Sequence, residues 1–230
     1  MTIVAIIPAR GGSKRIPHKN IKPFLGAPIL HWPIAAARAS RLFDHIIVST
    51  DDPEIADCAR TAGAEALMRP DDLADDFTGV VPVMRHAIAT LPDRIEAACL
   101  IYATAPFLLA DDLRRGRAAL KGAGYALSVT TFPFPIQRAV MRTPDNRLIM
   151  AFPEHAQTRS QDLPEALHDA AMFAWGTRAA WGSDTPLFGP DTAPVEIPRH
   201  RVQDLDTQED WIRAEYMGRA LIAAGEISPP

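Results

Sequence analysis

The residues with the clearest chemical capacity lie in a basic loop near the start of the chain. Residues 3–7 are apolar and lead into the segment Pro8-Ala9-Arg10-Gly11-Gly12-Ser13-Lys14-Arg15. Five residues between positions 10 and 22 are basic and none is acidic, although the 230-residue chain as a whole has a formal charge of −4. Cations gathered beside a glycine turn suit a small polyphosphate better than a nucleic-acid duplex, which needs a broad basic face.

The parts of this loop have different roles in such a phosphate site. Gly11 and Gly12 let the backbone turn sharply and present N–H groups to an anion. Arg10 can bind phosphate oxygens through two hydrogen bonds, whereas Lys14 and Lys19 act as point charges. The spacing matches neither of the common glycine-rich nucleotide motifs. The alternative is a solvated loop that only joins a strand to a helix, but the paired glycines after an apolar strand favour the phosphate site.

A second feature is a pair of carboxylates near the C-terminal end, in Gln203-Asp204-Leu205-Asp206-Thr207. In an extended segment, residues two apart face the same side, so Asp204 and Asp206 would point to one place. Two adjacent carboxylates repel each other unless a cation lies between them, and magnesium is commonly held by one or two carboxylates plus substrate phosphates. The alternative is that both residues cap the helix expected to begin at Thr207. The basic loop favours the metal.

A third group of polar residues lies in the second half of the chain. Arg138, Arg159, Gln161, His168 and Asp169 could bind a sugar that carries carboxylate or amide groups. Because a single histidine is more often structural than catalytic, this group is a weaker indication than the other two.

These residues need a scaffold, and the order of the predicted elements indicates which one. Strands are predicted at residues 3–7, 45–49, 65–68, 97–102 and 125–131, and helices at 28–40, 53–62, 78–91 and 111–122. Alternating strands and helices with short connections predict an α/β fold with three αβα layers and a mostly parallel, Rossmann-like sheet. Ligands of such sheets bind at the carboxyl ends of the strands, which is where the basic loop lies.

The alternation stops after residue 131. Pro133 and Pro135 exclude a helix there, and residues 133–167 are predicted to form a cap or arm inserted into a single domain of residues 1–230. Strand character returns at 168–176 and 193–198, and a last amphipathic helix is expected from 207 to 224.

Composition excludes several classes of protein. The chain is 47% hydrophobic and 23% charged, as in ordinary globular proteins, and it has no apolar run long enough to span a membrane. No signal peptide is recognisable, and Cys58 and Cys99 form no Cys-x-x-Cys pair, so zinc and disulfides are not expected. We therefore expect a cytoplasmic protein that binds neither nucleic acid nor membrane.

The motifs resemble those of the cytidylyltransferases that activate nonulosonic (sialic-type) acids. The opening segment Pro8-Ala9-Arg10-Gly11-Gly12-Ser13-Lys14-Arg15-Ile16-Pro17-x-Lys19-Asn20 carries the resemblance first. Four further motifs follow in the same order: Ile47-Val48-Ser49-Thr50-Asp51, Arg69-Pro70-x-x-Leu73-Ala74-x-Asp76, Thr104-x-Pro106 and Asp204-x-Asp206-Thr207. Within that family, the segments Phe132–Ala139, Arg159–Leu163 and His168–Ala170 look most like the pseudaminic acid cytidylyltransferases.

The resemblance implies a nucleotide-diphospho-sugar transferase type of fold and a reaction. The anomeric hydroxyl of the sugar acid would attack the α-phosphate of CTP, giving CMP-sugar and pyrophosphate, with Mg2+ as cofactor. By similarity, Arg10, Lys19, Asp204 and Asp206 would be catalytic, and Asp204 and Asp206 would hold the metal. The nucleotide would contact Ala9, Arg10, Gly11, Gly12, Ser13, Lys14, Lys19, Asn20, Arg69 and Asp76. The sugar would contact Tyr102, Gln137, Arg138, Arg159, Gln161, His168 and Asp169. The arm would also form a homodimer contact.

Some positions depart from the family pattern and leave other functions open. Sialic-acid members carry Gln where Tyr102 stands, and pseudaminic-type members have Gly, Gln and Tyr where Ala171, Met172 and Ala174 stand. Synthesis of CMP-N-acetylneuraminate or CMP-legionaminate is therefore an alternative. Two alternatives of another class are a GT-A-like glycosyltransferase with Asp204-Leu205-Asp206 as its metal motif, and an inactive nucleotide- or sugar-binding module.

Overall fold

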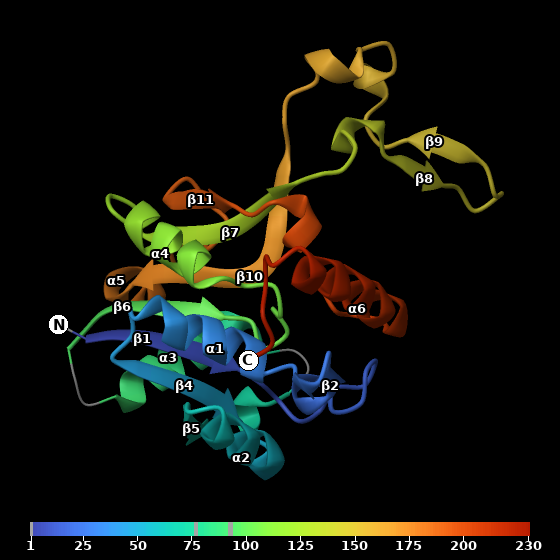
Figure 1. Cartoon of the computed structure of the whole chain (residues 1–230). Helices are drawn as coiled ribbons and strands as arrows, with labels where there is room; N and C mark the ends of the chain where they lie inside the picture. The colour runs from blue at the N-terminus through green and yellow to red at the C-terminus, as the bar shows by residue number, and fades with distance from the viewer. Residues whose placement is uncertain (1, 76–77, 92–93) are drawn as a thin grey trace.

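A seven-stranded sheet is the frame of the protein, shown in Figure 1 as a computed structural model that describes residues 2–75, 78–91 and 94–230. Its strands lie in the order β11-β7-β10-β6-β1-β4-β5. Their bounds are β1 (Thr2–Pro8), β4 (His45–Thr50), β5 (Glu65–Met68), β6 (Ile95–Ile101), β7 (Tyr125–Thr131), β10 (Leu167–Thr177) and β11 (Thr192–Glu196). Parallel pairing joins β1 to β4 and β6, β4 to β5, and β7 to β11, whereas β10 is antiparallel to β6 and β7. The mostly parallel sheet expected from the sequence is confirmed.

Helices cover both faces of this sheet, which confirms the three layers. They are α1 (His31–Ser40), α2 (Pro53–Thr61), α3 (Val80–Thr90), α4 (Ala110–Ala119), α5 (Arg178–Gly182) and α6 (Gln208–Ala223). Helices α1, α2, α4 and α6 contribute side chains to one buried apolar cluster, and α3 and α5 contribute to the other. No described helix has the length and apolar character needed to cross a membrane.

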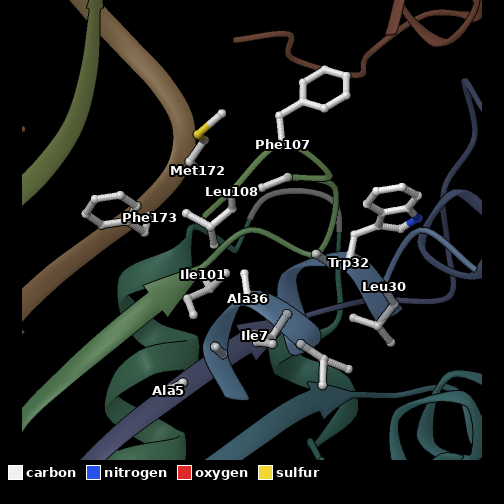
Figure 2. Close-up of a cluster of buried hydrophobic side chains, with 14 of the residues drawn as sticks. Ala5, Ile7, Leu30, Trp32, Ala36, Ile101, Phe107, Leu108, Met172 and Phe173 are labelled. Carbon is white, nitrogen blue, oxygen red and sulfur yellow. The ribbon is translucent and has the colours of Figure 1, made fainter. Parts of the chain in front are cut away.

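The apolar run of β1 is explained by its place between these two clusters. Ala5 and Ile7 belong to the first cluster, whereas Val4 and Ile6 belong to the second, and all four are fully buried. Figure 2 shows Ala5 and Ile7 beside Ile101 of β6 within the first cluster. Because alternate residues of a strand face opposite sides, a strand buried on both faces must be apolar throughout.

Helix α4 is seated directly on β10 because one of its residues lacks a side chain. A Cβ atom at Gly116 would lie 2.5 Å from Phe173 Cε2 and 2.6 Å from Trp175 Cδ1. The indole Nε1 of Trp175 also donates a hydrogen bond to the carbonyl of Leu113, at 3.1 Å. These contacts hold α4 at one position on the sheet.

Between β7 and β10 the chain leaves the sheet and forms an arm, which projects away from the rest of the protein in Figure 1. The arm contains a short hairpin of β8 (Val140–Arg142) and β9 (Leu148–Met150). Its apolar side chains are unusually exposed: Phe134 is 77% and Leu148 is 68% exposed.

Several element boundaries differ from those expected. Helix α1 begins at His31, because Pro28 pairs with Pro23 in the hairpin of β2 (Pro23–Phe24) and β3 (Ala27–Pro28). Helix α3 follows Gly79 and has no side-chain cap, so Thr78 does not cap it. Ile227, which follows the last helix, is buried in the first cluster.

Strand β10 contains an irregularity near its start. Its register with β7 shifts between Asp169 and Ala174, and Ala171 adopts a left-handed φ of 51°. The carboxylate of Asp169 accepts a hydrogen bond from the Ala171 N–H at 2.7 Å, and Ser128 Oγ accepts from the Met172 and Phe173 N–H groups. Where the pairing of β10 with β7 is interrupted, side-chain oxygens thus take the place of backbone carbonyls as hydrogen-bond acceptors.

Replacing Ala171 by glycine is expected to stabilise the protein. A left-handed alanine costs roughly 1–2 kcal/mol, which exceeds the roughly 0.4–1 kcal/mol that the extra freedom of glycine costs through the unfolded chain. We expect Ala171→Gly to raise the free energy of unfolding by up to about 1 kcal/mol in urea titrations. Ala170→Gly is the matched control and should lower it, because Ala170 is buried and has no positive φ. If Ala171→Gly lowers the free energy of unfolding, the claim that the backbone is strained at Ala171 is wrong.

Candidate functional site

The carboxyl ends of three neighbouring parallel strands lie at one edge of the sheet, where two cavities are found. The loop after β1, the end of β4 and the loop after β6 all lie there. One cavity of about 220 Å³ is lined by Pro8, Arg10, Lys19, Asn20, Arg69, Thr78, Gly79, Val80, Val83, Tyr102, Ala103 and Thr104. A second, of about 270 Å³, is lined by Arg10, Ser13, Lys14, Arg15, Lys19 and Asn20. The two share Arg10, Lys19 and Asn20 and so adjoin each other.

The basic loop is held in place by its neighbours at the sheet edge. The Gly11 N–H donates to Asp51 Oδ1 at 3.1 Å, and the buried Asn20 donates through Nδ2 to the Arg10 carbonyl at 2.8 Å. A Cβ atom at Gly11 would lie 2.5 Å from Asp52 Oδ2, so only glycine fits at this position. Asp52 in turn accepts hydrogen bonds from the first turn of α2, which confirms it as the cap of that helix.

Arg69 lies in the wall of the first cavity and is mostly buried. Its Nη2 donates to the Ser49 carbonyl at 2.6 Å and its Nη1 to the Leu73 carbonyl at 3.2 Å. Burial lowers the pKa of Arg69, and the nearby negative charge of Asp51 opposes that shift. Its buried Nε has no hydrogen-bond partner among the described residues. Asp76, which was also predicted to contact the nucleotide, lies outside the described residues.

The basic loop touches the acidic segment that lies nearly 200 positions further along the chain. Lys19 Nζ donates to the Leu205 carbonyl at 2.7 Å and lies 3.7 Å from Asp206 Oδ1. Arg15 Nη2 lies 2.8 Å from the same oxygen. Both partners of the Arg15–Asp206 ion pair are exposed, so the pair is weak and its groups can exchange it for a ligand. The predicted phosphate and metal residues therefore lie side by side.

The cap of α6 uses residues other than the predicted metal pair. Thr207 Oγ1 accepts from the Asp210 N–H at 3.2 Å, and Asp210 Oδ2 accepts from the N–H groups of Thr207 and Asp206 at 2.7 and 3.2 Å. The alternative that Asp204 and Asp206 cap this helix is therefore wrong. Thr207 and Asp210 form a capping box at this end of the helix.

The carboxylate of Asp204 is electrostatically unfavourable where it stands. Partial loss of hydration raises the pKa of Asp204, and the charge of Asp206 raises it further, although Lys19 opposes this. Groups of three or more His, Cys, Asp or Glu side chains arranged to hold a metal do not occur among residues 2–75, 78–91 and 94–230. Within the described residues the site thus offers the two carboxylates Asp204 and Asp206, and magnesium is commonly held by one or two carboxylates when substrate phosphates supply further oxygens.

A third cavity, of about 350 Å³, includes Asp204 in its lining and shares no lining residue with the other two. It is lined by Thr130, Thr131, Pro133, His168, Asp169, Ala170, Arg199, Val202, Gln203, Asp204 and Arg213. Burial raises the pKa of Asp169, and Asp204 adds to that shift. Burial also raises the pKa of Tyr102, with Asp169 and Asp204 as further causes. Tyr102 itself lines the first cavity.

The structure brings together only part of the residues predicted to bind a sugar. His168 and Asp169 line the third cavity, whereas Gln137, Arg138, Arg159 and Gln161 lie in the arm. Within the arm, Gln137 donates to the Pro164 carbonyl, Arg138 to the Ala156 and Thr158 carbonyls, and Arg159 to Asp162. In a single chain these four residues do not line that cavity, and their role in binding sugar stays a prediction.

Three residues that line the third cavity were not among the predicted site residues: Arg199, Gln203 and Arg213. Arg199 belongs to a short 3₁₀ turn, Arg199–Arg201, and Arg213 lies in the second turn of α6. The available signal was the cluster of basic residues on both sides of the Asp204–Asp206 pair. Their positions relative to the cavity depend on how the chain enters α6, which residue spacing does not show.

Comparison with known proteins agrees with this arrangement. A cytidylyltransferase family profile matches residues 4–198. The chain is 39% identical over 216 residues to the pseudaminic acid cytidylyltransferase of Campylobacter jejuni, covering 91% of this chain and 93% of that protein. It is 32% identical over 158 residues to the CMP-N,N'-diacetyllegionaminic acid synthase of Legionella pneumophila, covering 67% and 68% of the two chains. A solved CMP:2-keto-3-deoxy-manno-octonic acid synthetase in complex with CTP has a similar fold, with a TM-score of 0.67 at 16% identity over 98% of this chain and all of that chain. This chain therefore belongs to the cytidylyltransferase family.

Proposed function

We propose that this protein transfers CMP from CTP to a nonulosonic sugar acid, pseudaminic acid, and releases pyrophosphate. The observation that carries the proposal is the contact between the basic loop and the acidic segment, made by Lys19 and Arg15 with residues 205 and 206. It makes one site for a polyphosphate and a divalent cation. The activity named for the Campylobacter jejuni relative supports the choice of sugar.

The nucleotide occupies the two adjoining cavities at the sheet edge. Arg10, Lys14 and Lys19 offset the charge of the triphosphate, and Ser13 adds a hydroxyl donor. The N–H groups of Ala9 and Gly11 are bound to the Ser49 carbonyl and to Asp51, so these two do not serve the triphosphate. Asn20 donates one of its two amide hydrogens to the Arg10 carbonyl, so its oxygen and its second N–H could both bind the nucleoside. An acceptor on the base or ribose would satisfy Nε of Arg69, which is buried without a partner in the described chain.

A divalent cation, Mg2+, would be held by Asp204 and Asp206. The two carboxylates fit this role because the charge of Asp206 raises the pKa of Asp204, and a cation would relieve that repulsion. When bound, the cation lowers the pKa of a coordinated hydroxyl and aligns it with the phosphate. The protein itself positions the reactants and stabilises negative charge, which are the main demands of phosphoryl transfer.

The sugar acid fits the cavity beyond Asp204. Arg199 and Arg213 bring positive charge to a cavity that also contains Asp169 and Asp204, and a sugar carboxylate would pair with these arginines. Asp204 lines the cavity, so a sugar hydroxyl there can approach the α-phosphate.

The rival functions fit the structure less well. A glycosyltransferase would use the acidic pair to bind its metal, but that function gives no role to the five cations of the basic loop. The inactive-module alternative drew on the changes at Ala171, Met172 and Ala174. Ala171 lies at the backbone irregularity of β10, and the side chains of Met172 and Ala174 are buried in the apolar clusters on opposite faces of the sheet. Their identity therefore affects packing rather than the chemistry of the site.

The arm is proposed to complete the assembly as a homodimer contact. Phe134, Val140, Met141, Leu148 and Ile149 are apolar side chains of the arm that water would cover in a monomer. A second copy packed on these side chains could bring Gln137, Arg138, Arg159 and Gln161 near a sugar site.

The direct test of the proposed function is pyrophosphate release from CTP and Mg2+, with pseudaminic, legionaminic and N-acetylneuraminic acids offered separately. We expect release with pseudaminic acid. Release with only one of the other acids keeps the chemistry and overturns the sugar. CTP binding without release with any of the three contradicts the proposal.

Arg10→Ala should greatly reduce turnover. Loss of one charge-stabilising donor typically costs about 3–4 kcal/mol of transition-state stabilisation, a drop of about 10²–10³-fold in kcat. The control is Arg60→Ala, an exposed residue of α2 that pairs only locally with Asp57 and should leave kcat unchanged. Near-normal turnover in a folded Arg10→Ala protein would place the triphosphate elsewhere.

Replacing Asp206 by asparagine should lower the pKa of Asp204. Since the pKa of Asp204 is raised in the folded protein, its charge costs folding free energy at neutral pH, and this cost is lost as the pH falls through the folded pKa. Asp206→Asn removes the neighbouring charge and leaves Lys19 to favour the ionised form. Carboxyl 13C NMR titration measures the pKa, and Glu209→Gln, in the first turn of α6, is the control. An unchanged or higher pKa for Asp204 would be inconsistent with a repelling pair.

A further inference from the structure

A buried ion pair lies three residues before Asp204. Arg201 binds Asp112 through two hydrogen bonds, from Nη1 to Oδ2 at 2.6 Å and from Nη2 to Oδ1 at 3.0 Å. The side chains are only 7% and 2% exposed. Neither residue lines the three cavities of the site. Burying two charges costs free energy, and the proposed reaction gives this pair no role.

The pair joins three separate parts of the chain. Arg201 Nη1 also donates to the Phe107 carbonyl at 3.1 Å, in the loop after β6 that begins with Tyr102. Asp112 accepts from the Leu109 N–H at 3.0 Å at the start of α4, and from Arg115 at 2.7 Å. Burial alone would raise the pKa of Asp112, but the hydrogen bonds from Arg201 and Arg115 outweigh it and hold the pKa below its usual value.

Helix α4 gives this pair a rigid base. Gly116 leaves no space between α4 and the aromatic side chains of Phe173 and Trp175 on β10. A residue anchored to Asp112 is therefore anchored to the sheet, and the 3₁₀ turn Arg199–Arg201 is fixed at its last residue.

The opposite end of the acidic segment is fixed as well. Lys19 holds the Leu205 carbonyl, and Asp210 holds the Asp206 N–H. Only Val202, Gln203 and Asp204 lie between these supports and Arg201, and all three line the cavity assigned to the sugar acid. The support at Arg201 determines where this short segment starts.

We propose that the Arg201–Asp112 pair is a positioning device that sets the place of the Asp204 carboxylate and thereby the affinity of the site for a divalent cation. The inference rests on the proposed function, because it takes Asp204 as a metal ligand. Residues that orient metal ligands typically change metal affinity or activity by about 10–100-fold when they are replaced.

The test separates this role from simple stabilisation of the fold. Arg201→Met and Asp112→Leu each leave one buried charge unpaired and should lower the Tm, whereas the double variant removes both charges and should recover much of it. In the double variant we expect unchanged CTP binding without metal. We also expect Mn2+ binding, measured by electron paramagnetic resonance with CTP present, to weaken by about tenfold or more. The Mg2+ concentration for half-maximal pyrophosphate release should rise in parallel.

Two further variants keep the outcome interpretable. Arg201→Lys keeps the charge but loses the two-pronged geometry, so it should fold and show a smaller loss of Mn2+ affinity. Arg115→Met removes another partner of Asp112. Because the second hydrogen bond of Arg115 goes to the Glu196 carbonyl rather than to the acidic segment, Mn2+ affinity should not change.

The failures of the two proposals can be told apart. Wild-type Mn2+ affinity in both the double variant and Arg201→Lys would show that the pair only stabilises the fold, and would overturn the inference while the proposed function stands. If Asp204→Asn and Asp206→Asn leave the Mn2+ affinity of the CTP complex unchanged, the metal site and the inference fall together.

Discussion

The contact between Lys19 and the segment of residues 204–206 is the interaction on which the site depends. A lysine after the first strand holds the Leu205 carbonyl at 2.7 Å and lies 3.7 Å from Asp206. Without it, the cations would be a charged loop and the carboxylates a polar turn before a helix. With it, opposite charges face each other across a space that a metal-bound polyphosphate can fill. The contact requires the loop after β1 and the segment before α6 to lie at the same edge of the sheet. The central position of β1 in the sheet allows this.

Strand β10 links the sheet to the third cavity, which is proposed to bind the sugar acid. It runs antiparallel between β6 and β7, and its irregular start directs His168 and Asp169 into the third cavity. The same strand carries Phe173 and Trp175, on which α4 rests with no gap at Gly116. The start of β10 thus lines the third cavity, and a later part of the same strand supports α4, the helix that carries Asp112. Strain at Ala171 is confined to the interruption between these two parts.

Much of this could be predicted from sequence because it depends on local pattern. The apolar run of β1, the glycine turn and the Asp-x-Asp pair are local, and so are most helix positions. The partners of β10 could not be predicted, since an apolar run does not show which strands lie beside it. Arg199 and Arg213 were missed because only the path of the chain into α6 brings them to the cavity. The capping question was open until Thr207 and Asp210 were seen to bond each other.

The most direct test of the account is the position of the metal and the triphosphate in crystals grown with CTP and Mn2+, located by the anomalous scattering of manganese. The account predicts a manganese peak bound by Asp204 and Asp206 and by phosphate oxygens, with the triphosphate against Arg10 and Lys19. A triphosphate bound outside the basic loop, or manganese bound without either carboxylate, would contradict it.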